Sequence, residues 1–157
     1  MSYAYTPSTV QEVADGLAAV LAASETVAAA AGEQPRVFLA DLDRRQMSAL
    51  CIVVAPVADN VPVRGAVDTC QVVVEVLLDT SAGNAGNFAA MAARPDGVYV
   101  GGTPPRRIDE IAQAVLAEIR AANPGALLTG TETSFDYSMR PLQIASITAD
   151  YETIKTF

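Results

Sequence analysis

The sequence predicts an α+β fold: a mainly antiparallel β-sheet with two helices packed on one face and a long Gly/Pro-rich loop. Apolar residues recur at helical spacing in two segments and at strand spacing in several others. The predicted order is α-β-β-β-loop-α-β-β, and without strict alternation of strands and helices a doubly wound parallel fold is disfavoured. A chain of 157 residues that is 51% hydrophobic fits a single domain over 1–157.

The first helix is expected at 8–23. Ser8 can cap it, with Gln11 three positions later as in a capping box. Its apolar stripe consists of Val10, Val13, Leu17, Val20 and Leu21. The Ala-rich stretch to Gly32 is interrupted by polar residues and is interpreted as a soluble helix, not a membrane span. The N-terminus lacks the basic region of a secretory signal.

Strands are expected within 36–79, at Arg36–Asp43, Leu50–Val57 and Gly65–Asp79, with a turn at Asp59, Asn60 and Pro62. The third has a continuous apolar face formed by Cys70, Val72, Val74, Val76 and Leu78. Its other face is mixed, with Gln71, Val73, Glu75, Leu77 and Asp79. This pattern predicts a long strand with one side buried.

The segment 80–105 is rich in Gly and Pro and is predicted to be a long loop, longer than ordinary connections. A second helix is expected at 105–122, with a stripe formed by Ile108, Ile111, Ala112, Val115 and Ile119. Asn123-Pro124-Gly125 is its stop signal. Strands within 131–155, at Thr131–Met139 and Ile144–Thr153, alternate polar and apolar residues and are expected to be half-exposed.

Composition excludes several classes of function. The chain has no His, which rules out Ser-His-Asp and Cys-His catalysis and His-ligated metals. Two Cys residues are too few for a disulfide framework or a zinc ribbon. With 18 acidic against 10 basic residues and a net charge of -8, the chain is a poor binder of phosphate backbones.

The remaining candidates for chemistry are weak. Asp41 and Asp43 would point the same way from a strand, but a solvated strand end is favoured over a metal site. The Gly-rich repeat at 82–87 lacks the pattern and the Lys of a phosphate-binding loop. Cys51 and Cys70 are expected to be buried, reduced thiols. No catalytic residue, metal or cofactor is therefore predicted.

The chain resembles the tail terminator (tail completion) proteins of long-tailed bacteriophages. The likeness lies in the stretches STVQEVADGLAAVLA, LCIVVAP, VRGAVDTCQVVVEVLLD, IDEIAQAVLAEI and FDYSMRPLQIASITADY. The resemblance implies a non-enzymatic virion protein at the neck, made in the host cytoplasm and not bound to membrane. It implies a homohexameric ring that caps the tail tube, joins the head connector, and has a lumen through which DNA passes without specific binding. An acidic surface suits such a lumen, because it repels DNA.

Three surfaces are candidate interfaces with other copies or with the tube. They are the mixed face of the long strand (Val73, Glu75, Leu77), the loop (Asn84, Asn87, Phe88) and the polar face of the last strand (Ser146, Thr148, Asp150, Glu152). For each there is a plain structural alternative: the loop is merely mobile, and Val73 and Leu77 are covered by a helix.

Two other functions remain open. One is another neck component of the head-closure type. The other is a small acidic ligand-binding or enzymatic domain that uses Asp41, Asp43 and Glu75, which would have to converge in one pocket.

Overall fold

A computed structural model of the chain describes residues 4–32, 34–40, 50–64, 67–79, 107–139 and 142–154. The helices in these ranges are α1 (Thr9–Ala23), α2 (Glu25–Ala31) and α4 (Arg107–Ala121). The strands are β1 (Arg36–Leu39), β2 (Leu50–Asn60), β3 (Val67–Asp79), β4 (Leu127–Asp136) and β5 (Leu142–Ile154).

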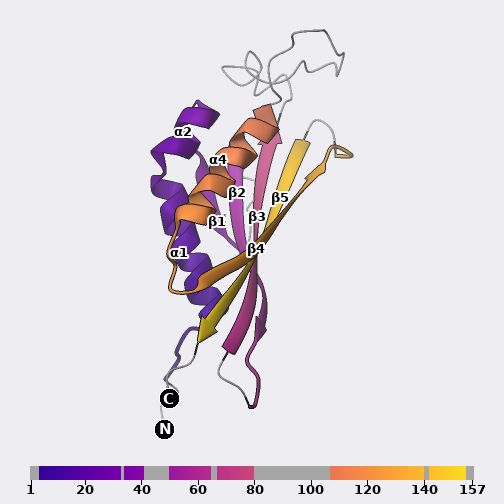
Figure 1. Cartoon of the computed structure of the whole chain (residues 1–157). Coiled ribbons are helices and arrows are strands. Elements are labelled where there is room, and N and C mark those ends of the chain that lie inside the picture. The colour runs from indigo at the N-terminus through magenta and orange to yellow at the C-terminus, as the bar shows by residue number, and fades with distance from the viewer. Residues whose placement is uncertain are drawn as a thin grey trace.

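The strands form one sheet in the order β1-β2-β3-β5-β4, and the helices lie on one of its faces (Figure 1). β1 is parallel to β2, and every other neighbouring pair is antiparallel. The predicted α+β fold with a mainly antiparallel sheet is therefore confirmed. The loop expected at 80–105 lies outside the described residues.

The hydrophobic core lies between the helices and one face of the sheet. The predicted buried face of β3 is confirmed, because all its residues belong to this core: Cys70, Val72, Val74, Val76 and Leu78. The helices contribute the apolar stripes of α1 and α4, among them Val13, Leu17, Leu21, Ile111, Val115 and Ile119. Val73, Glu75 and Leu77 point to the opposite face, away from the described helices α1, α2 and α4.

One helix more than predicted packs on this face. α1 begins as expected, with the Ser8 side chain accepting a hydrogen bond from the Gln11 amide. It ends at Ser24, whose hydroxyl accepts a hydrogen bond of 3.0 Å from the Val27 amide and so caps α2. Gly32, with φ 79°, ends α2 in the left-handed conformation that glycine adopts without strain.

Several strand boundaries differ from the expected ones. Two of them are the end of β4, at Asp136 instead of Met139, and the start of β5, at Leu142 instead of Ile144. β1 ends at Leu39, because Ala40 turns the backbone to φ 63°. β2 continues through Asp59 and Asn60, which were expected in a turn, by means of a register shift between Pro56 and Ala58. β4 begins at Leu127, four positions before the predicted Thr131.

In the described part of the chain, no single helix has the length and hydropathy of a membrane span. The pair α1 and α2 passes that test only when taken together, across a bend of 58°.

Candidate functional site

The face of the sheet opposite the helices brings together the two strand surfaces that the sequence singled out. Glu75 pairs across strands with Ser146, and Val73 pairs with Thr148. One step further along, Gln71 pairs with Asp150 and Thr69 with Glu152. The mixed face of β3 and the polar face of β5 are thus a single continuous surface, called here the helix-free face because the described helices α1, α2 and α4 all pack on the other side.

This surface is acidic. β3, β4 and β5 contain no Lys or Arg. By the register of the sheet, six of their carboxylates lie on the helix-free face: Glu75, Asp79, Glu132, Asp136, Asp150 and Glu152. Negative charges gathered on one side of a sheet repel polyanions and attract cationic groups.

Asp136 is held in its ionised form by its own turn. Its Oδ1 accepts hydrogen bonds from the Ser138 hydroxyl at 2.6 Å and from the Ser138 amide at 2.8 Å. These donors lower the pKa of Asp136 below its ordinary value. The carboxylate at this end of β4 therefore keeps its charge at neutral pH.

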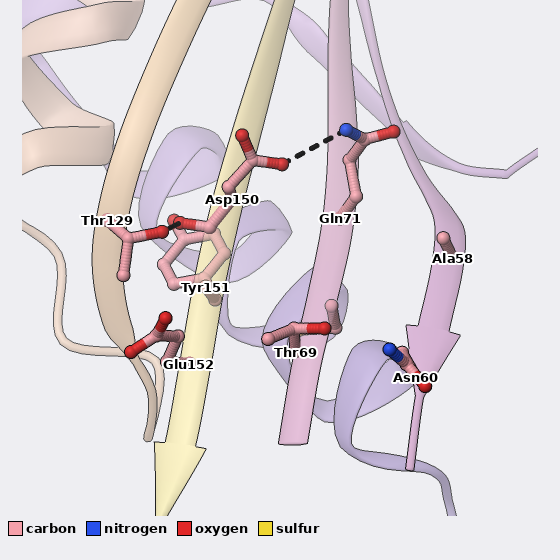
Figure 2. A pocket seen from close by; sticks show the side chains of 9 residues that line it. Ala58, Asn60, Thr69, Gln71, Thr129, Asp150, Tyr151 and Glu152 are labelled. Atoms are coloured by element: carbon pink, nitrogen blue, oxygen red, sulfur yellow. Dashed lines mark hydrogen bonds between the residues drawn. The ribbon is translucent and has the colours of Figure 1, made fainter. Parts of the chain in front are cut away.

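A shallow depression of about 370 Å³ lies on the acidic surface between β2, β3, β5 and β4. Figure 2 shows Gln71 and Asp150 pointing toward one another across β3 and β5, with Gln71 Nε2 donating to Asp150 Oδ1 at 3.0 Å. The Thr129 hydroxyl donates to the Asp150 carbonyl oxygen at 3.2 Å. The other lining residues are Ala58, Asn60, Thr69, Cys70, Tyr151 and Glu152.

These groups can contact a partner through charge and hydrogen bonds. Within the described ranges, no three Cys, Asp or Glu side chains are placed to hold a metal ion. Cys51 and Cys70 are buried thiols that form no disulfide, as predicted. Burial is the main cause that raises the pKa of the Cys70 thiol, and the negative charges of Asp59, Asp150 and Asp68 raise it further. This keeps it protonated and a poor nucleophile.

Tyr151 lies behind the depression, in the core, and is 1% exposed. Its hydroxyl makes no hydrogen bond within the described part of the chain. Burial, followed by the nearby Cys70, raises the pKa of Tyr151 from 10.0 to about 12. The phenol therefore stays neutral in the folded protein well beyond the pH at which an exposed tyrosine ionises.

We expect one of the five tyrosines to ionise late in an alkaline absorbance titration, and Tyr151→Phe to remove that step. Because the folded state holds this proton more tightly, the free energy of unfolding falls as the pH rises from about 10 toward about 12, and less so in the variant. At pH 7 the variant should match the parent within about 1 kcal/mol, since no hydrogen bond is lost. Tyr137→Phe is the control, and a late step that survives in Tyr151→Phe contradicts the assignment.

The predicted interface residues have different outcomes in the structure. Val73, Glu75, Ser146 and Thr148 are half-buried in the middle of the helix-free face, whereas Asp150 and Glu152 are exposed at its edge. Leu77 is 7% exposed. Asn84, Asn87 and Phe88 lie outside the described residues, and so do Asp41 and Asp43, which leaves their convergence with Glu75 untested.

Sequence reasoning missed Gln71, Glu132 and Asp136 as members of this surface. Gln71 was assigned to the mixed face of its strand, and the strand of Glu132 and Asp136 was expected to alternate, but alternation within a strand does not say which strands are neighbours. The signal that was present is the complete lack of Lys and Arg across three strands.

No family model matches the chain, and no curated protein sequence matches it. Among solved structures, the fold is similar to that of a chain in the virion of a native gene transfer agent (GTA) particle, with a TM-score of 0.50 and 15% sequence identity. The likeness covers 90% of this chain and 94% of that chain. At this identity it shows that the two chains share a fold.

Proposed function

We propose that this chain is a structural protein of a phage-like virion, specifically a tail terminator. The observation that carries the proposal is the shared fold with a chain of a gene transfer agent virion, which extends over nearly the whole of both chains. The sequence resemblance to tail terminator proteins points independently to the same kind of particle.

In this role the chain forms a ring, expected to be a hexamer, that caps the last ring of the tail tube and joins it to the head connector. It acts at the neck of the virion after synthesis in the host cytoplasm. Its partners are other copies of itself, the tail tube protein and the connector protein. The work is assembly, not catalysis, which suits a described surface without a metal cluster or an activated nucleophile.

The helix-free face is our candidate for the wall of the lumen. Affinity for DNA rests on Lys and Arg contacts to phosphates. The strands β3, β4 and β5 offer none, and they present six carboxylates on one side. DNA moving along such a wall is repelled from it and slides without adhering.

The test of the terminator role is assembly of the purified chain. Mass photometry and negative-stain imaging should show closed rings, and the rings should dock on the ends of tail tubes in a co-sedimentation assay. Docking on portal complexes instead of tubes would favour a head-closure component. A chain that stays monomeric and binds neither contradicts the proposal.

Reversing the charge of the helix-free face should create DNA binding. We expect the parent ring to show no binding to linear duplex DNA at about 50 mM salt, and Glu132→Lys/Asp150→Lys/Glu152→Lys to bind it in a salt-sensitive manner. The matched control reverses three helix carboxylates, Glu12, Glu25 and Glu118, which gives the same net charge. Fluorescence anisotropy measures both. Equal DNA affinity of the two triple variants contradicts the assignment of the lumen wall.

A further inference from the structure

The outer strands of the sheet are β1 and β4, and each pairs with a single described strand. β4 has few of the features by which proteins protect a sheet edge. Its sequence contains no Pro or Lys, and its register shift is confined to Leu128/Gly130. From Gly130 to Asp136 the edge therefore presents a regular row of backbone groups to a further strand.

Exposed apolar side chains accompany both edges. Phe135, Tyr137 and Met139, at the end of β4, are 40%, 36% and 52% exposed, and the rings of the first two stack with centroids 6.3 Å apart. On β1, Leu39 is 44% exposed. Apolar side chains beside an open edge favour an added strand, because pairing would cover them.

The two edges fit each other in direction and in side-chain orientation. The pairing of neighbouring strands makes β4 run opposite to β1. One row of cross-strand partners starts at Arg36 and ends at Asp136, after passing through Cys51, Leu77 and Ile144. Arg36 and Asp136 therefore lie on the same face.

The next row of cross-strand partners also places a residue of β1 and a residue of β4 on one face. It starts at Val37 and ends at Phe135, so these two side chains share the helix-bearing face. Pairing β4 of one copy with β1 of another would keep both faces continuous, because side chains alternate with a period of two along every strand.

We propose that β4 of each copy pairs antiparallel with β1 of the next copy, with Asp136 opposite Arg36 and Phe135 opposite Val37. The inference rests on the proposed function, since it names the contact that builds the ring. In this register Ser134 lies opposite Phe38, and Thr133 lies opposite Leu39. Opposite charges and apolar side chains directly across a strand pair stabilise it.

The complementarity points to a second copy as the occupant. Arg36 is the sole basic residue on the five strands, and this register sets it against a carboxylate. The contact joins the β4 edge of one copy to the β1 edge of the next. A row of copies therefore has an open β1 edge at one end and an open β4 edge at the other. Such a head-to-tail contact generates a ring when its rotation closes.

Cysteine cross-linking tests the register. Ser134→Cys and Phe38→Cys are made in separate chains, mixed at low concentration, concentrated and mildly oxidised. A covalent dimer is expected only in the mixture, because opposite positions on antiparallel strands lie within the Cα separation that a disulfide spans. Cys51 and Cys70 are buried and are the same in every sample.

The matched control is Ser146→Cys mixed with Phe38→Cys. Ser146 is the cross-strand partner of Ser134 on the same face, but it lies one strand inside the sheet. It should not cross-link. A dimer yield for Ser134→Cys no greater than that for Ser146→Cys overturns the pairing.

Charge reversal supplies a second measurement that does not depend on a disulfide. We expect Asp136→Arg alone and Arg36→Asp alone each to raise the protein concentration needed for assembly about tenfold, and the double variant to restore it. Circular dichroism confirms that each variant is folded. If both single variants assemble like the parent, the pairing is overturned.

The outcomes separate this contact from the ring itself. If the parent chain forms rings but Ser134→Cys and Phe38→Cys do not cross-link, the edge pairing is overturned and the terminator role stands. If the two cysteine variants cross-link but the copies assemble only into open rows, the edge pairing is supported and the proposed ring is contradicted. A parent chain that stays monomeric at high concentration overturns both.

Discussion

Val74→Asp is expected to abolish the folded state at neutral pH. Val74 lies at the centre of β3, is fully buried, and pairs with Val54 on one side and Ile147 on the other. The core around Val74, from strands and helices alike, contains only hydrophobic residues in the described part of the chain, so a carboxylate there would be buried without a counter-charge. Burial of one unpaired charge costs several kcal/mol, which is comparable to the whole stability of a small domain.

Far-UV circular dichroism and urea titration measure the effect of Val74→Asp. Val63→Asp is the matched control, because Val63 is 102% exposed and the same substitution there should leave the unfolding midpoint nearly unchanged. A cooperative urea transition of normal midpoint in Val74→Asp would show that β3 does not have its helix-bearing side in the core.

Leu17→Ala should lower the free energy of unfolding by about 2–5 kcal/mol. Leu17 is fully buried in the middle of α1, one turn from Val13 and from Leu21 in the same core. Removing its side chain loses the burial of three carbons and leaves a cavity that the helix and the sheet cannot fully close.

The same Leu→Ala substitution at an exposed position shows how much of the lost free energy of unfolding comes from packing in the core. Leu127 is 69% exposed at the start of β4, so Leu127→Ala should lower the free energy of unfolding by less than about 0.5 kcal/mol. Urea denaturation of both variants gives the comparison. Equal losses would contradict the packing of α1 on the sheet.

The patterns that predicted the fold correctly are those enforced by burial on one side. β3 alternates because its even-numbered residues face the helices, and β5 alternates because Ala145, Ile147, Ala149 and Tyr151 do so too. A period of two can be recognised in a single sequence whenever only one face of a sheet is covered.

The misplaced boundaries arise where one residue has two local interpretations. Ser24 interrupts an apolar run, which suggests that helical structure ends there. Its hydroxyl instead accepts a hydrogen bond from the Val27 amide and so caps a second helix. Gly130 suggests a loop, yet β4 runs through it because pairing with β5 absorbs the irregularity as a register shift. At Gly130 tertiary pairing outweighs the local signal, whereas at Ser24 one local signal, the helix cap, outweighs another.

The candidate site could be predicted only in parts. Alternation assigned Glu75 and Asp150 each to one side of its strand, and it could not show that β5 lies beside β3 or that β4 closes the row. That order depends on pairing between segments far apart in the chain, for which neither propensity nor spacing carries a signal. The surface therefore became visible as one unit only in the folded chain.

The order of the strands also sets the order of events in folding. β3 pairs with β5, so Val74 meets Ile147 about 70 positions further along the chain. Contacts this distant are slow to form, because the entropy of closing the intervening chain is lost before any contact compensates for it. During synthesis β3 is left with an unpaired edge until β5 leaves the ribosome, which makes the late emergence of this strand the step most exposed to misassembly.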